Sequence, residues 1–207
     1  MEVLTQFGNV PVDYSVLRAV FFEYATPRNK VSRLENEGKL IRLKKGLYVV
    51  SPDLSGSLLS VELIANHLYG PSYVSMESAL GYYNLIPEHV YTVRSMTLNR
   101  SKKFQNQIGT FQYITVDQDY YSIGVRQETI NKNTFLIASP EKALCDMITS
   151  TQCLHLQSIK GIMEYLEYDL RFDITALFGM DTSILTQCTL TGKKKSALKL
   201  LLQLIQR

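Results

Sequence analysis

The sequence predicts an α+β chain in which a winged helix-turn-helix over residues 1–52 is followed by a mixed α/β domain over residues 53–207. Three observations lead to this prediction. A short basic helix, a glycine and a basic hairpin follow one another between residues 26 and 50. A stretch of Ser, Pro and Gly at residues 51–57 then breaks the composition, as domain boundaries do. Helical and strand-like patterns are mixed over the remaining chain.

Charge is distributed unevenly along the chain. The chain has 207 residues, of which 45% are hydrophobic, enough for a small domain and a medium-sized one. The formal net charge of +3 says little about partners. Between residues 28 and 45, however, seven basic residues stand against the two acids Glu35 and Glu37; the basic ones are Arg28, Lys30, Arg33, Lys39, Arg42, Lys44 and Lys45. This segregation predicts a basic face tied to one region.

The cysteines and histidines predict neither a disulfide framework nor a metal site, and no cofactor is expected. The three cysteines are odd in number, form no Cys-x-x-Cys pair and sit among apolar residues, which is typical of reduced core residues; they are Cys145, Cys153 and Cys188. The histidines show no ligand spacing; they are His67, His89 and His155.

The reduced cysteines favour a cytoplasmic chain, and the N-terminus predicts no signal peptide. It lacks the basic and apolar regions of a secretory signal peptide. No apolar run approaches the roughly 20 residues that a membrane span needs, so no membrane partner is expected.

Two helices are expected before the hairpin. Residues 14–24 place apolar side chains at helical spacing; these are Val16, Leu17, Val20, Phe21 and Tyr24. Thr26 offers an N-cap and Pro27 suits the first helical position, while Gly38 marks the end of the second helix. Within that helix Val31 and Leu34 must face the core, and a polar set occupies the opposite face: Asn29, Ser32, Arg33 and Asn36.

A tight basic hairpin follows the second helix. The runs 40–43 and 47–50 are β-prone and flank Lys44, Lys45 and Gly46. Gly46 is expected at positive φ, which a side chain would disfavour. Two lysines at the tip are well placed for phosphates. The alternative interpretation is that residues 28–45 form a solvated basic surface without a ligand.

The rest of the chain predicts helices and strands in mixed order. We expect a buried helix over 58–69, a second helix capped by Ser75, strands over 90–96 and 110–116, and a buried strand over 135–138. Ser139, Pro140 and Glu141 then start a helix. Further helices are expected near 157–167 and 196–206.

Outside the basic run the candidates for chemistry are few. A second basic cluster lies between two predicted strands and is interpreted as a polar loop, with contact to nucleic acid or a partner as the alternative; it comprises Arg94, Arg100, Lys102 and Lys103. Lys142 and Asp146 are spaced to form an i,i+4 ion pair. Motifs of acyl transfer and of nucleotide binding do not occur, so no enzyme and no catalytic residue is predicted.

Three segments together resemble the AbiEi family of antitoxins from abortive-infection toxin–antitoxin systems. Residues 38–48 resemble the family's wing, and residues 73–87 resemble the start of its C-terminal domain. Residues 139–146, Ser-Pro-Glu-Lys-Ala-Leu-Cys-Asp, resemble its Pro-Glu-Lys-Ala-Leu-x-Asp helix. The segments stand in the expected order, whereas residues 150–207 carry no such resemblance.

The resemblance implies a cytoplasmic bacterial antitoxin that is not an enzyme. The N-terminal domain would bind operator DNA with inverted repeats and repress its own operon, and residues 53–207 would counteract a nucleotidyltransferase-type toxin. Carried onto this sequence, the DNA-binding residues would be Arg28, Asn29, Ser32 and Arg33 from the helix and Lys44 and Lys45 from the wing. Two alternatives stay open: a stand-alone winged-helix regulator whose C-terminal domain senses a ligand, and an enzyme on nucleic acid with Glu141 and Asp146 as its acids.

Overall fold

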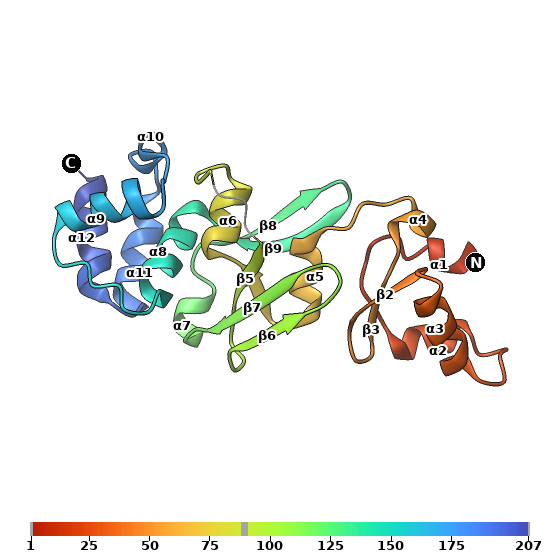
Figure 1. Cartoon of the computed structure of the whole chain (residues 1–207). Helices are drawn as coiled ribbons and strands as arrows, with labels where there is room; N and C mark the ends of the chain where they lie inside the picture. Colours follow the sequence, from red (N-terminus) through yellow and green to blue (C-terminus); the bar gives the residue numbers. More distant parts are fainter. Residues whose placement is uncertain (1, 88–90, 207) are drawn as a thin grey trace.

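A computed structural model describes residues 2–87 and 91–206; His89 and the first residue of the strand predicted over 90–96 lie outside them. The described residues form 12 α-helices, a π-helical segment and two β-sheets, which confirms the predicted α+β class. Figure 1 shows the N-terminal elements at one end of the molecule and the C-terminal helices at the other.

The N-terminal elements surround a small apolar core. In chain order they are α1 (Glu2–Thr5), β1 (Val12–Asp13), α2 (Tyr14–Val20), α3 (Pro27–Asn36), β2 (Leu40–Lys44), β3 (Leu47–Val50) and α4 (Pro52–Ser55). The strands form an antiparallel sheet in the order β1-β3-β2. Leu17 of α2, Val31 and Leu34 of α3, and Leu40 and Val50 of the hairpin are buried together.

Local sequence signals place α3 and the hairpin. Pro27 occupies the first turn of α3, and Gly38 just beyond the helix has φ 69°, as predicted. Thr26 precedes the helix, but its side chain makes no capping hydrogen bond. Gly46 in the hairpin turn has φ 83°, which confirms the predicted positive φ.

Helix α2 is shorter than its pattern predicts. It ends at Val20 and is followed by a turn, and Leu17 and Phe21 are the residues of the pattern that are buried. Val16 and Tyr24 are 42% and 47% exposed. The prediction of a buried helix over 14–24 is therefore wrong in part: the backbone leaves the helical conformation at Phe21, so Tyr24 lies beyond the helix, and Val16 lies on the exposed side of α2.

A six-stranded mixed sheet organises the remainder of the chain. Its strands are β4 (Ser72–Val74), β5 (Thr92–Thr97), β6 (Lys102–Gln105), β7 (Thr110–Thr115), β8 (Val125–Ile130) and β9 (Asn133–Ala138), in the order β6-β7-β5-β4-β9-β8. The pairs β4–β9 and β5–β7 are parallel, and the other neighbours are antiparallel. Strand β6 lies where a polar loop was predicted, so that part of the prediction is wrong.

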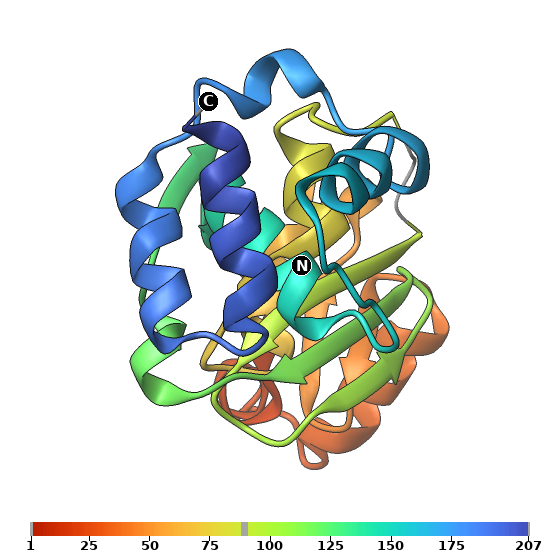
Figure 2. The same cartoon turned by 90° about the vertical axis from the view of Figure 1, so that its left-hand side faces the viewer.

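Helices cover both faces of this sheet. One face carries α5 (Val61–Leu68), which lies between the sheet and the N-terminal elements, and the other carries α6 (Met76–Tyr82) and α8 (Pro140–Ser150) (Figure 1). The remaining helical elements are α7 (Gln118–Tyr121), α9 (Ile159–Glu164), the π-helical segment Tyr165–Asp169, α10 (Ile174–Leu177), α11 (Thr182–Thr191) and α12 (Lys195–Ile205). Figure 2 shows α11 and α12 packed side by side at the C-terminal end.

The hairpin β2–β3 contributes to two cores. Leu40 and Val50 belong to the small core, whereas Leu43, Leu47 and Val49 belong to the large one. Because successive side chains of a strand point to opposite faces, the hairpin is covered on both sides. Two hydrogen bonds link the hairpin to the elements that surround the large core: Lys44 Nζ donates to Leu68 O at 2.6 Å, and Asn106 Nδ2 donates to Leu43 O at 3.1 Å. A third links the N-terminal elements to the segment before α5, where Asn9 Nδ2 donates to Leu58 O at 2.5 Å.

Within the described ranges, no helix combines the length and the apolar character that crossing a bilayer would require.

Candidate functional site

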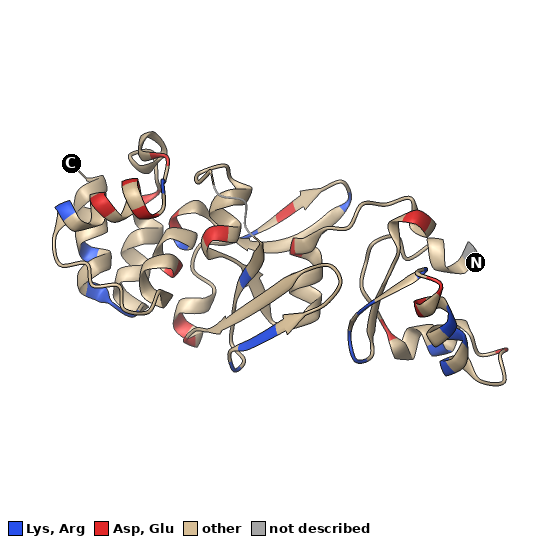
Figure 3. Cartoon of the chain, in the orientation of Figure 1, with Lys and Arg blue, Asp and Glu red and all other residues tan. Residues whose placement is uncertain are grey.

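A groove of about 500 Å³ lies between α3 and the β2–β3 hairpin. Its lining comes from α2, α3 and the hairpin: Tyr14, Arg28, Val31, Ser32, Glu35, Arg42, Lys45, Gly46 and Tyr48. The groove therefore brings together Arg28, Ser32 and Lys45, three of the residues that the sequence predicted to bind DNA. Figure 3 shows Lys and Arg gathered on α3 and at the turn of the hairpin.

The groove carries an excess of positive charge. Arg28, Arg42 and Lys45 stand against the single carboxylate of Glu35. Arg42 Nη1 lies 4.0 Å from Glu35 Oε1, and both side chains remain partly exposed, so this pair neutralises little. Arg28 and Lys45 are exposed and form no ion pair with any residue in 2–87 or 91–206. Two cations are thus free to meet an anion.

Asn29 and Arg33 lie on the neighbouring stripe of α3. Both are exposed, but neither lines the groove. Arg33 Nε lies 3.5 Å from Glu37 Oε1, one turn further along the helix. Lys39 donates to the same carboxylate at 2.7 Å and, with Arg33, holds the pKa of Glu37 below its usual value. The positive charge of Arg33 is therefore partly neutralised by Glu37, in contrast to that of Arg28.

Lys44 points away from the groove. It is half-buried, and its ammonium donates to Leu68 O near the C-terminus of α5, where helix carbonyls attract a cation. Arg42 and Lys44 would share a face in a regular strand. A β-bulge intervenes: Arg42 pairs with Tyr48, but Lys44 pairs with Leu47, and a bulge re-aims the residues that follow it. The structure thus separates Lys44 from Lys45.

The second basic cluster is not gathered into one patch. Arg94 Nη1 donates to Glu77 Oε1 at 2.8 Å on the side of α6. Lys102 and Lys103 are neighbours on β6 and therefore point to opposite faces. Lys102 Nζ lies 4.9 Å from the ring centroid of Phe104, a cation–π distance, and Arg100 is exposed in the turn before the strand.

Six of the nine lining residues of the groove were not among the predicted site residues, and three of them, Tyr14, Arg42 and Tyr48, offer polar groups or rings to a ligand. Arg42 was counted in the basic run, but the face of the hairpin on which its side chain lies was not predicted. Tyr14 comes from the start of α2, and Tyr48 comes from β3, opposite Arg42. Alternation along the hairpin places Arg42 and Tyr48 on the α3 side with Leu40 and Val50, a signal that could have identified them.

The helix of the Pro-Glu-Lys-Ala-Leu-x-Asp segment holds a buried polar cluster. Lys142 and Asp146 of α8 have side chains that are 0% exposed, with Nζ and Oδ1 3.5 Å apart. Asp146 Oδ2 accepts from Ser75 Oγ at 2.6 Å and from Tyr73 Oη at 3.1 Å. Lys142 Nζ donates to Tyr120 O at 2.8 Å. Burial raises the pKa of Asp146, whereas the nearby Lys142 ammonium opposes that shift.

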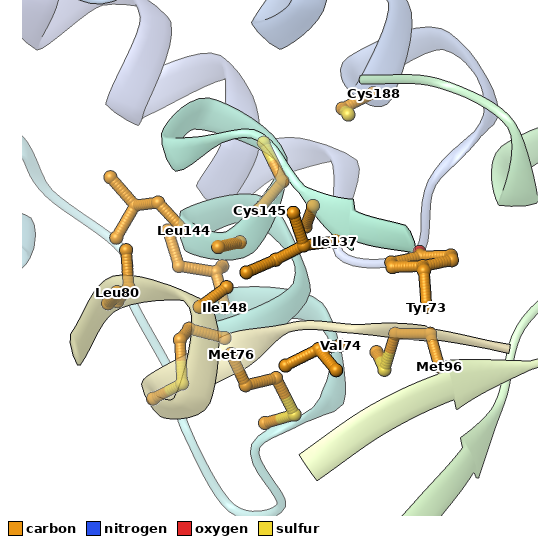
Figure 4. Close-up of a cluster of buried hydrophobic side chains, with 14 of the residues drawn as sticks. Tyr73, Val74, Met76, Leu80, Met96, Ile137, Leu144, Cys145, Ile148 and Cys188 are labelled. Carbon is orange, nitrogen blue, oxygen red and sulfur yellow. The ribbon is translucent and has the colours of Figure 1, made fainter. Parts of the chain in front are cut away.

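This polar cluster lies in the interior, on a helix whose neighbouring residues Ala143, Leu144, Cys145 and Met147 belong to the large core. Figure 4 shows a cluster of buried hydrophobic side chains that includes Val74, Met76, Ile137 and Tyr73, and the hydroxyl of Tyr73 donates to Asp146. Glu141, the other acid of the enzyme hypothesis, faces elsewhere: its Oε1 accepts from Asp181 N at 3.1 Å. Glu141 and Asp146 therefore do not share one cleft.

The cysteines differ from one another in burial. Cys145 and Cys188 are buried as predicted, but Cys153 is exposed, which corrects the prediction for that residue. Contact with Cys188 and burial both raise the pKa of the Cys145 thiol. No group of three or more His, Cys, Asp or Glu side chains among the described residues is arranged to hold a metal ion.

A comparison of the chain with models of known protein families gives no match, and a comparison with curated proteins gives none either.

Proposed function

We propose that residues 1–52 form a winged helix-turn-helix and that its groove binds duplex DNA. The observation that carries this proposal is the convergence of Arg28, Arg42 and Lys45 on one groove beside the exposed face of α3. The order of elements supports the winged-helix assignment: helix, strand, two helices and a hairpin, with a sheet in the order β1-β3-β2. In such a domain the second helix of the pair enters the major groove.

The residues fall into groups with different roles in this proposal. Arg28, Arg42 and Lys45 contact phosphates, which releases counterions and makes affinity depend on salt. Asn29 and Ser32 lie on the exposed face of α3, where amide and hydroxyl groups can bond base edges. Arg33 contacts the DNA backbone once its ion pair with Glu37 has broken. Lys44 holds the hairpin against α5 and is left out of the contact set.

We further propose that the chain is a cytoplasmic antitoxin of an AbiE-type system and has no catalytic role of its own. On this proposal it represses its own promoter at inverted repeats, and residues 53–207 counteract a nucleotidyltransferase-type toxin. The support is the resemblance of residues 38–48, 73–87 and 139–146, in order, to AbiEi antitoxins. The buried cluster of Lys142 and Asp146 gives the third of these segments a structural role in that domain.

Replacing Arg28 and Lys45 together by alanine is expected to weaken DNA binding by about tenfold or more and to lower the salt slope by about two. The substitution removes two phosphate contacts. It breaks no ion pair within the described residues, because neither side chain forms one there. The measurement is fluorescence anisotropy with a labelled DNA duplex taken from the region upstream of the gene for this chain, titrated with protein at several salt concentrations.

Lys102→Ala with Lys103→Ala is the matched control, because it removes the same charge from β6. It should leave both affinity and salt slope near the wild-type values. If this control loses binding while the groove variant retains it, the DNA site lies on β6 and the groove assignment is wrong.

The antitoxin role predicts that the Arg28→Ala/Lys45→Ala chain still protects cells from the toxin encoded by the adjacent gene. The substituted residues belong to the groove, whereas protection is assigned to residues 53–207. Growth is measured in cells that express the toxin together with the wild-type chain, the variant or an empty vector. Failure of the wild-type chain to restore growth would refute the antitoxin assignment and leave the DNA result unaffected.

A further inference from the structure

The two edges of the six-stranded sheet differ in their charge. One edge is β6, which carries Lys102 and Lys103 exposed. Lysines at a sheet edge discourage pairing with another strand. The other edge is β8, Val125–Ile130, where a basic and an acidic residue alternate with uncharged ones. Arg126, Gln127, Thr129 and Ile130 of this strand are exposed.

The backbone of β8 presents free hydrogen-bonding groups at its centre. Gln127 pairs with Leu136 of β9. The N–H and C=O of Leu136 are both engaged by the Asn66 side chain on the far side of β9, at 2.6 and 3.3 Å. Pairs in an antiparallel ladder alternate between bonded and non-bonded. The Gln127 pair is therefore non-bonded, and the N–H and C=O of Gln127 point to the open edge.

A second copy of the same strand can pair with this edge in an antiparallel manner. With the twofold axis at Gln127, the two Gln127 residues exchange backbone hydrogen bonds, and Thr129 N–H reaches the C=O of Val125 in the other copy. Arg126 of each copy then stands directly opposite Glu128 of the other copy. Opposite charges at facing positions stabilise a strand pair, whereas like charges destabilise it.

Charge selects this register over its neighbours. An axis at Arg126 would set the two Arg126 side chains against each other, and an axis at Glu128 would do the same for the two carboxylates. Arg126 remains available for the new contact, because its side chain is 49% exposed and its ion pair with Glu141 is long, with Nη2 and Oε2 4.0 Å apart. The sequence of β8 is thus self-complementary about Gln127.

We propose that this chain forms a twofold homodimer in which β8 of each copy pairs antiparallel about Gln127, with two Arg126–Glu128 ion pairs across the axis. The two sheets then continue into one another. A pair of strands buries a small area, so the equilibrium depends on protein concentration.

Charge reversal on the full-length chain tests the register. Sedimentation equilibrium should show wild-type protein passing from the 23.6 kDa monomer to a dimer as its concentration rises. Glu128→Arg sets Arg against Arg, and Arg126→Glu sets Glu against Glu, so each variant alone should raise the dimer dissociation constant about tenfold or more. The double variant Arg126→Glu/Glu128→Arg restores both pairs and should dimerise like wild type.

Mixing the two single variants gives the sharpest outcome. In a heterodimer of Glu128→Arg with Arg126→Glu, every facing pair is again of opposite charge, so an equimolar mixture should associate more tightly than either component does alone. Lys103→Glu on β6 is the control and should leave the mass unchanged; circular dichroism verifies that each variant is folded. A wild-type chain that stays monomeric, or a dimer insensitive to charge reversal, overturns the proposal. Since the readout is mass, neither result bears on the DNA groove.

Discussion

Replacing Asp146 by alanine is expected to lower the free energy of unfolding by about 3–5 kcal/mol. The substitution leaves the Lys142 ammonium buried without its carboxylate, in a position that is 0% exposed. Ser75 and Tyr73 also lose their acceptor, and buried donors without a partner carry a desolvation cost. Urea unfolding of the full-length chain, followed by circular dichroism, measures the loss.

The pair should behave very differently when both of its members are removed. Lys142→Met alone should destabilise the chain as Asp146→Ala does, because a carboxylate is then left unpaired. Lys142→Met with Asp146→Leu should cost less than the sum of the two single changes, since no buried charge remains.

An exposed pair of the same spacing provides the control. Lys160 and Glu164 lie 3.7 Å apart, with side chains that are 85% and 54% exposed. Glu164→Ala should change the free energy of unfolding by only about 0–1 kcal/mol. Equal losses for Asp146→Ala and Glu164→Ala would mean that the buried pair is not a structural anchor.

The Lys142–Asp146 pair also shows how far sequence reasoning reaches. The start of α8 at Ser139 and Pro140 and the i,i+4 contact are both present, as predicted. Burial of the pair was not predicted, because it depends on partners that are distant in sequence. Tyr73 and Ser75 lie more than 70 residues before Asp146 and reach it only when β4 joins the sheet beside β9. The sequence suggested Ser75 as a helix cap, but its hydroxyl bonds Asp146 instead and caps nothing.

The basic groove was also predictable only where it depends on local sequence. Local signals predicted α3 and the hairpin, and Arg28, Ser32 and Lys45 converge there. The position of Lys44 depends on a β-bulge and on the carbonyl of Leu68 in a helix that lies outside the hairpin. Neither the bulge nor that contact has a signature in the run Leu-Lys-Lys-Gly.

Polar edge strands were the weakest part of the sequence analysis. Lys102–Gln105 and Val125–Ile130 lack the apolar alternation that identifies a half-buried strand. They are strands because β7 and β9 provide hydrogen-bonding partners along one side. The feature that hid β8 from prediction, its alternating charges, is the feature that makes it self-complementary.

Gly124→Ala is expected to lower the free energy of unfolding by about 2–5 kcal/mol, the second large effect. Gly124 has φ 62°, and a left-handed conformation costs an L-residue roughly 1–2 kcal/mol. An added Cβ would also lie 2.9 Å from Lys142 Cβ and 2.9 Å from Ile184 Cγ2. Overpacking of this kind typically costs about 1–3 kcal/mol. Urea unfolding again provides the measurement.

Gly46→Ala separates the two contributions. Gly46 has φ 83° but no atom within 4 Å of an added Cβ, so its substitution should show the backbone cost alone. The excess loss in Gly124→Ala then reports the packing of the turn before β8 against α8 and α11. Adding Ile184→Ala to Gly124→Ala relieves only one contact, because Lys142 Cβ is fixed by the backbone of α8. Part of the excess should therefore persist in that double variant relative to Ile184→Ala alone. A Gly124→Ala loss no larger than that of Gly46→Ala would contradict this close approach of Gly124, just before β8, to α8.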